Sequence, residues 1–495
     1  MAASGTDGEH DASPGGACVQ WRITMSACVR VARIRHARVA GSQATGEPPA
    51  MTRDADPASS RSLQGDAALL RAVGSLALAA AVINIIVGGG IFKMPAALSA
   101  QVGAAAPLAL LAGALVMVPV ALCFAAIGSR ASATGGPYTY VSAVFGTLPG
   151  FLAGALMWIC NVASSAGVAA ALSLQAASLW PVLDAPLPRA LLLLGVYAAI
   201  YALNAFGVKL GARAVMTLAT LKLVPLFLLV IVGLAFVDTS HVSFAFADVP
   251  SWTALGAAMV MVVFAYSGVE TALIPGGEVR DPSRSVPRAA LSAILLVVLL
   301  YLGLQIVCQG VLGPALATSS VPIAEAAGRL WDPARIALLV TACISMAGFL
   351  LGNLLGSSRL LFALGRDGYL PQAFGRVSAT HRVPLLALAT HAGIACLLAV
   401  VGNFEALVLI SGGAVCLVYV MVCAAAWRAQ RTDLRERGEP FVLRGGPLVP
   451  GLAVVGMVAI LTTLSTREWT AIGVAVVVLA IVYAVLVGLR RRVGS

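Results

Sequence analysis

The chain contains about twelve apolar runs, each long enough to cross a hydrocarbon layer of ~30 Å as a helix. Of its residues 60% are hydrophobic and 11% are charged, whereas soluble domains carry about 25% charged residues. Backbone polar groups in lipid must be satisfied within the chain, so such runs fold as helices. The sequence therefore predicts an all-α polytopic membrane protein with about twelve transmembrane helices. We place them at 70–98, 105–128, 147–180, 188–206, 213–236, 254–277, 286–312, 335–364, 384–401, 405–428, 449–465 and 469–489.

Lysine and arginine are distributed unevenly between the loops on the two sides of these helices. With the N-terminus inside, the outer loops carry Arg189, Arg329, Arg335 and Arg467, and Lys93 lies near the outer end of the first span. The inner loops carry Arg130; Lys209 and Arg213; Arg280, Arg284 and Arg288; Arg359, Arg366, Arg376 and Arg382; Arg428, Arg431, Arg435, Arg437 and Arg444; and Arg490 to Arg492. This asymmetry supports the helix count and predicts a multi-pass protein with both termini in the cytoplasm. It also accounts for most of the net charge of +11, so no nucleic-acid partner is expected.

The first 66 residues are polar, rich in Gly, Ala, Ser and Arg, and lack periodicity, which is typical of a disordered tail. They contain no long apolar segment followed by a cleavage site, so we expect no signal peptide. Met51 opens a segment that is typical of a cytoplasmic leader, and we hypothesise that residues 1–50 reflect a misassigned start. A peptide from within 1–50 in mass spectrometry of the native protein would refute this hypothesis.

The nine cysteines are scattered and form no CxxC pair. We expect them to be small apolar fillers, with no disulfide framework, no metal site and no cofactor. The sequence contains neither a nucleotide-binding loop nor a nucleophile–base set within the spans. It therefore predicts a protein that is not an enzyme and not an ATP-driven pump.

The first apolar run carries Gly88, Gly89 and Gly90 in mid-span. Glycines are weak helix formers and leave the backbone free to unwind. Unwound backbone at this depth is tolerated only where it is buried in protein or lines a cavity. The triplet therefore indicates a substrate site whose free N–H groups can bind an anionic group. The alternative is that the glycines only let another helix pack closely.

The sixth run repeats this feature about 180 residues later. Ser267 and Gly268 lie in mid-span there, and the ionisable Glu270 follows. The repeat advances by five spans from one break to the next, and because five is odd the second set of five must be inverted across the membrane. Paired interruptions in inverted halves are the best sequence indication of a transporter binding site. We predict a 5+5 inverted repeat with discontinuous helices 1 and 6 over residues 67–430, then two peripheral transmembrane helices and a short tail in 431–495.

Motifs in this core resemble those of the amino acid–polyamine–organocation superfamily. The segment IVGGGIF at 86–92 is similar to the GxGIF signature of that superfamily. Further matches are YSGVE at 266–270, GEVRDP at 277–282, SVP at 285–287, GGPY at 135–138 and GRDGYLP at 365–371. The resemblance covers residues from about 70 to 430 and implies a leucine-transporter-type fold with amino acid or polyamine substrates.

The resemblance also implies how a free amino acid is held. Its carboxylate meets the N–H groups of the glycine triplet, at the positive end of the outer half-helix. Its ammonium meets carbonyl groups near Ile86, Phe264 and Ser267, at the C-terminal ends of the half-helices. Any side chain at Gly90 is expected to clash with the substrate, although packing alone can forbid it too.

Lys222 lies inside the fifth run, where an intramembrane charge is a functional candidate. The alternative is that its side chain snorkels to the cytoplasmic interface. The residue matches a family lysine of sodium-independent members. That resemblance implies that its ammonium takes the place of a sodium ion by bonding carbonyls of the inner half of helix 1. It also implies that sodium coupling is disfavoured. Because the amine is expected to be buried, it can also cycle a proton.

Five further residues are candidates. Glu270 matches a family glutamate and is interpreted as a proton-responsive group or an anchor of the break, or else as a neutral structural acid. Asn161 aligns with a substrate-contacting asparagine of some members, or makes an interhelical hydrogen bond. Asn353 stands where relatives present an aromatic side chain, which puts recognition by guanidinium stacking in doubt. Phe264 and Tyr266 line or gate the pocket, or simply pack.

The leading hypothesis is an amino acid permease of the plasma membrane that works by alternating access, coupled to protons or by exchange. A polyamine or organic-cation exchanger is the nearest alternative, but a cationic substrate calls for an acidic side chain beyond Glu270. A channel or a non-transporting amino acid sensor is the alternative of another class. The sequence leaves open the substrate, the direction of flux and the oligomeric state.

Overall fold

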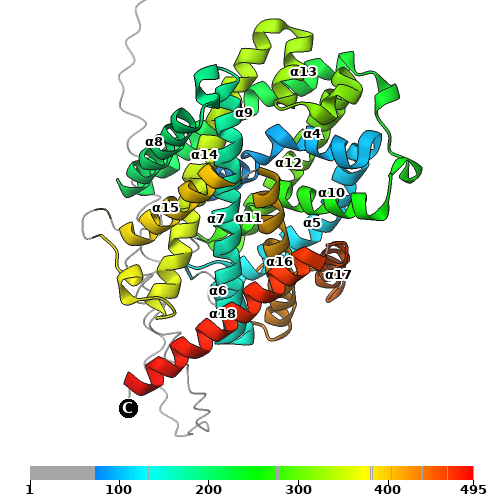
Figure 1. The fold of residues 1–495 in the computed structure, drawn as a ribbon. Helices are drawn as coiled ribbons and strands as arrows, with labels where there is room; N and C mark the ends of the chain where they lie inside the picture. The colour runs from blue at the N-terminus through cyan, green and yellow to red at the C-terminus, as the bar shows by residue number, and fades with distance from the viewer. Residues whose placement is uncertain are drawn as a thin grey trace, which may run out of the picture. The chain divides into compact units, whose positions relative to one another are not determined.

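The structure is a computed structural model that describes residues 73–493, except 132, 207, 275–278, 379–380, 382, 403, 436–438 and 465. All of them belong to one compact unit, Asp56–Ser495. The predicted tail, including Met51, lies outside the described residues, and so does most of the loop after the sixth run. The described part is built from helices, with one isolated β-bridge between Val73 and Val279. The predicted all-α class is confirmed (Figure 1).

The long helices follow the predicted apolar runs. They are α5 Ala106–Arg130, α7 Thr147–Ala177, α8 Pro186–Ala205, α9 Val208–Gly233, α12 Pro282–Leu312, α14 Asp332–Arg366, α15 Leu385–Val401, α16 Phe404–Arg431, α17 Leu448–Thr462 and α18 Thr466–Val493. The first run is divided into α3 Ser75–Ile86 and α4 Gly90–Val102, and the sixth into α10 Trp252–Tyr266 and α11 Val269–Leu273. Both predicted interruptions are therefore present.

Two short helices that the apolar runs did not indicate are α6 Pro137–Phe145 and α13 Pro322–Leu330, each of nine residues. Proline is the first residue of each, where its missing N–H leaves no hydrogen bond unmade. Gly146 ends α6 with φ of 91°, a conformation that glycine adopts without steric cost. Each short helix packs on the long helix that follows it, α6 on α7 and α13 on α14.

The two halves of the core repeat the same order of elements. A broken helix, a long helix, a nine-residue helix and three more helices run from α3 to α9, and the same series runs from α10 to α16. Contacts repeat as well. The contact of α3 with α9 matches that of α10 with α16, and α14 on α9 matches α7 on α16. Counterparts also pack on each other, namely α5 on α12, α7 on α14 and α8 on α15.

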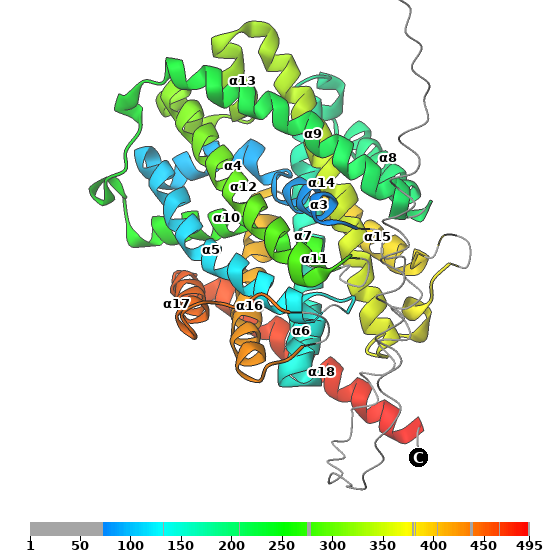
Figure 2. The same cartoon turned by 180° about the vertical axis from the view of Figure 1, so that it is seen from behind.

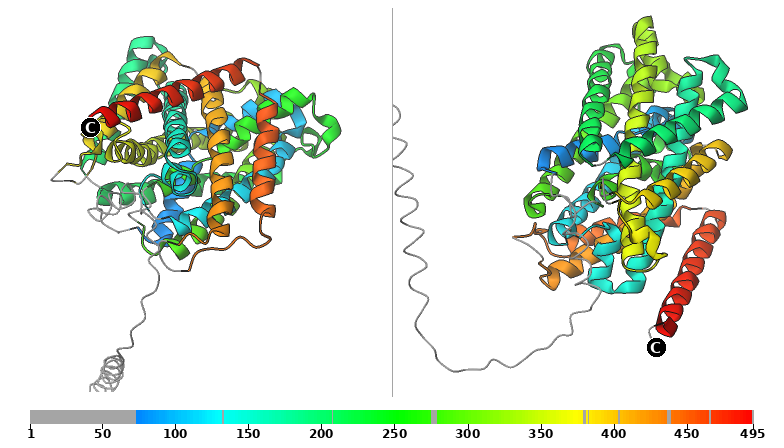
Figure 3. Two further views of the ribbon diagram at one scale, coloured as in Figure 1. Left: turned by 90° about the horizontal axis from the view of Figure 1, so that it is seen from below. Right: turned by 90° about the vertical axis from the view of Figure 1, so that its left-hand side faces the viewer.

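Seven helical stretches in the described part are long and apolar enough to cross a membrane, and five shorter apolar helices accompany them. This supports a multi-pass membrane protein, while the count of twelve spans stays a prediction. Helix α3 lies in the middle of the unit beside α9, α12 and α14 (Figure 2). Helix α18 lies across the outside of the unit, against α7 and α16 (Figure 3).

Candidate functional site

The first break releases the carbonyl groups at the end of α3, and side chains from three other helices bind them. Lys222 Nζ on α9 donates to the backbone oxygens of Asn84, at 2.7 Å, and Val87, at 2.5 Å. Tyr301 on α12 donates its hydroxyl to Ile86 O at 2.6 Å. Buried backbone carbonyls need such partners. The break is therefore a backbone conformation that side chains far away in the sequence stabilise.

Ser345 on α14 completes this arrangement. Its hydroxyl lies 3.0 Å from Val87 O and 3.1 Å from Gly88 O. Asn84 is itself fully buried, and its side-chain amide donates to Gly348 O on α14 at 2.8 Å. Helices α9, α12 and α14 thus all contribute a polar side chain to the last turn of α3.

The N–H groups on the other side of the break have no such partners. Gly89 and Gly90 N–H make no hydrogen bond to any acceptor in the part of the chain that the structure describes. They lie at the start of α4, a helix of 13 residues, where the macrodipole favours a negative charge. The break therefore presents free donors, as an anion site at a helix N-terminus requires.

Each glycine of the triplet is also closely packed. A Cβ atom at Gly88 would lie 2.5 Å from the Phe349 ring, and one at Gly89 would lie 2.4 Å from the side chain of Val168. A Cβ atom at Gly90 would lie 3.1 Å from the Phe264 ring, which leaves this position the most space of the three. The three glycines are thus closely packed, as the alternative interpretation predicts, and they also lie in unwound backbone.

The second break lies against the first. Gly268 has φ of 137°, in the region that favours glycine. A Cβ atom there would lie 2.9 Å from Cγ1 of Ile86 and 3.0 Å from Ile85. Ser267 turns back on α10, because both its N–H, at 3.2 Å, and its hydroxyl, at 2.7 Å, donate to Phe264 O.

Glu270 closes the second break. Its Oε1 accepts the N–H of Gly268 at 2.8 Å, and its Oε2 accepts the hydroxyl of Tyr419 on α16 at 2.8 Å. The side chain is buried. Both carboxyl oxygens therefore have partners within the protein, in the geometry of an anchor that fixes Gly268 and connects α11 to α16.

Two of the carbonyl groups that the resemblance assigns to a substrate ammonium, those of Ile86 and Phe264, are occupied in this structure. Ile86 O accepts both Gly88 N–H, at 2.7 Å, and Tyr301 OH. Phe264 O accepts both groups of Ser267. A carbonyl oxygen has two lone pairs, so an ammonium group binds these atoms only if a hydroxyl turns away.

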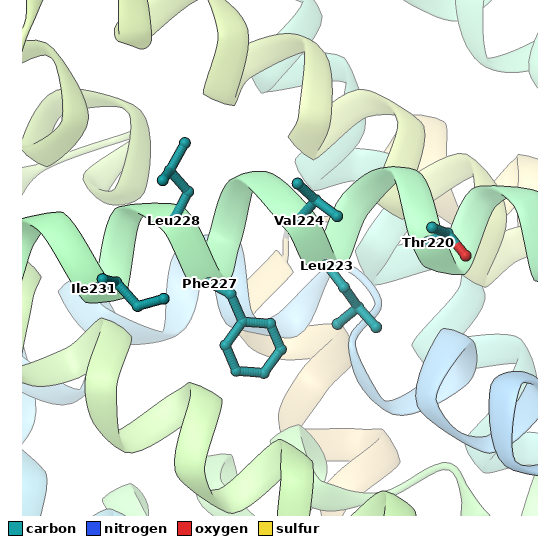
Figure 4. A pocket seen from close by; sticks show the side chains of 6 residues that line it. All are labelled: Thr220, Leu223, Val224, Phe227, Leu228 and Ile231. Carbon is teal, nitrogen blue, oxygen red and sulfur yellow. The ribbon is translucent and has the colours of Figure 1, made fainter.

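Lys222 is fully buried, whereas its neighbours on α9 face outward. Leu221 is 52% exposed and Val224 is 62% exposed. An outward groove of about 510 Å³ runs along this helix and is lined by Thr220, Leu223, Val224, Phe227, Leu228 and Ile231 (Figure 4). It is apolar except for Thr220 and lies on the face of α9 opposite to the Lys222 amine, as a surface that faces lipid would. Lys222 does not extend to the interface but into the break.

Asn161 and Asn353 lie together with a residue that sequence analysis did not single out. Thr271 Oγ1 on α11 donates to Asn161 Oδ1 at 2.9 Å, and Asn353 Nδ2 lies 3.5 Å from the same oxygen. Asn353 lies one helical turn beyond Phe349, which packs on Gly88. The remaining amide atoms, Asn161 Nδ2 and Asn353 Oδ1, have no hydrogen-bond partner in the described part of the chain.

The two aromatic candidates have different surroundings. The Phe264 ring lies at Gly90 and makes an edge contact with Phe404, with ring centroids 6.4 Å apart. Tyr266 instead points toward α5 and α12. It stacks on Tyr301 at 5.6 Å and places its hydroxyl 3.3 Å from Leu110 O. Phe264 therefore borders the break, and Tyr266 supports the tyrosine that binds Ile86.

Two of the loop motifs meet at one end of the unit. The Tyr138 hydroxyl donates to Asp367 Oδ2 at 2.7 Å, and Arg366 binds the same carboxylate with Nε at 2.9 Å and with a second nitrogen at 3.0 Å. Burial, and then the neighbouring Asp367 carboxylate, raise the pKa of Tyr138. The hydroxyl therefore keeps its proton and remains a donor that joins α6 to the end of α14.

Sequence analysis missed Tyr301, Ser345, Tyr419 and Thr271. Each is a polar side chain within an apolar run, which is the only signal that the sequence offers for them. Their partners lie 215, 258, 149 and 110 residues away along the chain. Only the packing of the helices brings these groups together.

Comparison with known proteins supplies the family. The profile of a family described as amino acid permease matches residues 73–491. The serine/threonine exchanger SteT of Bacillus subtilis is 28% identical over 87% of this chain and 99% of its own length. The Asc-type amino acid transporter 1 of Homo sapiens is 28% identical over 69% of this chain and 68% of its own length. The b(0,+)-type amino acid transporter 1 of Mus musculus is 26% identical over 74% of this chain and 78% of its own length. These relatives are transporters, in agreement with the sequence-based prediction that the chain is not an enzyme. The chain belongs to the amino acid permease family of the amino acid–polyamine–organocation superfamily.

Proposed function

We propose that this permease is a sodium-independent secondary transporter that moves amino acids across the plasma membrane by alternating access, in exchange or with protons. Twelve spans with a leucine-transporter-type 5+5 inverted repeat are part of the proposal. The matching order and contacts of the two halves support it, because halves that rock against each other around a central site are the usual basis of alternating access.

One observation carries the proposal of sodium independence. Lys222 Nζ, buried at the first break, donates to the carbonyls of Asn84 and Val87. Unwound carbonyl groups at half-helix ends are the ligands that sodium uses in transporters of this kind. A cation that is part of the chain already occupies this position. Coupling to a soluble sodium ion therefore has no role at this break.

The substrate is proposed to bind between the breaks. Its carboxylate would accept the free N–H groups of Gly89 and Gly90, beside Gly88, and its ammonium would bind Ile86 O, Phe264 O or Ser267 after a hydroxyl turns away. Phe264 would cover the site. Asn161 and Asn353, which have unsatisfied amide atoms, would face the substrate side chain, and Tyr266 would act only through Tyr301.

We propose small neutral amino acids with polar side chains as substrates. A relative that aligns over 99% of its own length is named a serine/threonine exchanger. Glu270 has both oxygens occupied within the protein, which makes it a poor partner for a polyamine. The same two hydrogen bonds suit a role in which protonation of Glu270 releases the second break.

The test is uptake and counterflow of radiolabelled serine in proteoliposomes of the purified full chain. Wild type should take up serine equally well in sodium and in potassium buffer. Lys222→Met removes the charge at similar volume and should abolish uptake. Leu221→Ala, next to it on the lipid face, is the matched control and should retain uptake.

Each outcome decides a separate point. A strict sodium requirement, or wild-type uptake by Lys222→Met, would overturn the role of Lys222. Flux without saturation or counterflow would indicate a channel. A thermal shift with amino acids but no flux would indicate a sensor, and a shift with polyamines alone would indicate an amine exchanger.

A further inference from the structure

A second groove, at the end of α16, has a chemistry that the transport site does not explain. It has a volume of about 440 Å³ and is lined by Phe145, Ala424, Trp427, Arg428, Arg431 and Thr432. These residues come from the last two turns of α16, the turn after it and the end of α6. The groove therefore combines two guanidinium groups with apolar and aromatic side chains.

Aromatic rings hold both guanidinium groups in place. The Arg428 guanidinium lies 5.4 Å from the centroid of the Phe145 ring, and that of Arg431 lies 5.9 Å from the Trp427 ring. Such cation–π contacts use the face of the guanidinium plane and leave its N–H edges for another partner. The side chains are thus positioned without being neutralised.

The nearby carboxylate is already engaged elsewhere. Asp433 accepts Arg435 Nε at 2.7 Å and lies 3.9 Å from Arg130. The hydrogen bond from Arg435 lowers the pKa of Asp433, so this carboxyl group stays ionised and paired. In the described part of the chain, neither Arg428 nor Arg431 forms an ion pair with a carboxylate.

The position of the groove matches the boundary between hydrocarbon and water. Residues 406–431 form a stretch of α16 that is apolar and long enough to cross a membrane, and the two arginines lie at its end. Trp427 is 39% exposed there, as is common for tryptophan at the headgroup level. The groove on α9 differs, because its lining is apolar except for Thr220 and carries no charge to select one lipid over another.

We infer that this groove binds an anionic phospholipid. The phosphate oxygens accept hydrogen bonds from the free N–H groups of Arg428 and Arg431. Each guanidinium group can donate two parallel hydrogen bonds to a phosphate. The glycerol and the first methylene groups of an acyl chain pack on Phe145, Ala424 and Trp427. Basic pockets between helices on the cytoplasmic side of a membrane suit acidic headgroups in this way. The site is separate from the transport site and does not depend on the proposed transport activity.

Native mass spectrometry of the full chain in detergent, titrated with phosphatidylglycerol or phosphatidylcholine, tests this inference. Wild type should retain phosphatidylglycerol in preference to phosphatidylcholine. Each arginine near an anionic headgroup contributes about fivefold to binding. The double variant R428Q/R431Q should therefore lose phosphatidylglycerol by more than about tenfold. Arg376→Gln, which removes one positive charge at an exposed loop position outside the groove, should bind as wild type does.

Two further measurements keep the outcome decisive. The melting temperature of R428Q/R431Q shows whether the variant is folded, and R428K/R431K, which keeps the charge, should retain part of the preference. Equal retention of the two lipids by wild type would overturn the inference, as would unchanged phosphatidylglycerol binding in R428Q/R431Q. If wild type is a dimer, and R428Q/R431Q is a monomer that binds as much lipid as wild type, then a second copy of the chain occupies the groove. That result would also overturn the inference.

Discussion

At the scale of single residues, the site depends on glycines that differ in how much space surrounds them. Gly89 is opposed by Val168 at 2.4 Å, and Gly90 by Phe264 at 3.1 Å. A methyl group at the first position forces a packed side chain to move, whereas at the second a small shift of one ring suffices. The three consecutive glycines of this break therefore differ in how well they tolerate an added side chain.

We expect Gly89→Ala to lower the free energy of unfolding by about 1–3 kcal/mol, the usual range for overpacking, and Gly90→Ala to lower it less. Gly195→Ala is the control, because a Cβ atom there has nothing within 4 Å and should stabilise α8 by about 0.5–1 kcal/mol. Thermal unfolding of the purified variants measures all three. Gly90→Leu should in addition lose substrate binding, and unchanged affinity would mean that the triplet serves packing alone.

Tyr419 is the residue-scale test of the second break. Tyr419→Phe removes the hydroxyl that Glu270 Oε2 accepts, and a lost hydrogen bond to a buried carboxyl group should cost about 1–3 kcal/mol of stability. Tyr483→Phe removes a comparable hydroxyl from the surface bond to Thr147 and should have little effect. Equal melting temperatures for Tyr419→Phe and wild type would contradict the anchoring role of Glu270.

At the scale of elements, the end of α3 is held by separate helices rather than by its own caps. Its C-terminal carbonyls meet α9 through Lys222, α12 through Tyr301 and α14 through Ser345. Movement of any of these helices therefore changes the hydrogen bonding of the break. This gives the broken helix a direct connection to the packing of its neighbours.

Ser345→Ala should weaken this connection. Val87 O keeps Lys222, but Gly88 O loses its side-chain donor, so we expect a stability loss of about 1–3 kcal/mol and slower serine uptake. Ser358→Ala is the control on the same helix, because its hydroxyl bonds to Leu355 O of its own helix and replaces no backbone partner. If both variants transport at the wild-type rate, Ser345 does not support the break.

Features that depend on neighbouring residues could be predicted from the sequence, whereas features that depend on contacts between distant residues could not. The breaks were predictable, because Gly88 to Gly90 and Ser267-Gly268 are local departures from an apolar run. Helices α6 and α13 were not, because nine residues are too few to stand out by hydrophobicity alone. The hydroxyl partners of the breaks could not be assigned either, since their pairing depends on contacts between distant helices.

At the scale of the whole molecule, the arrangement of charge predicts the orientation in the membrane. Arg366, Arg376, Arg428 and Arg431 follow spans that the positive-inside rule places with their C-terminal ends in the cytoplasm. We expect a protease site engineered after Ser495 to be cut only when cells are permeabilised. Cleavage in intact cells would place the C-terminus outside and would reverse the assignment of every loop.

The repeated order of the two halves extends to the residues that contact the two breaks. Lys222 lies fourteen residues after the first residue of α9, and Tyr419 fifteen after that of α16, its counterpart. Each half thus reaches its own interrupted helix from nearly the same place on its last helix. The first contact is an amine on bare carbonyls, and the second is a phenol on a carboxyl group. Because the two contacts differ in chemistry, we expect a mutation or a change of protonation at one break to leave the other break intact.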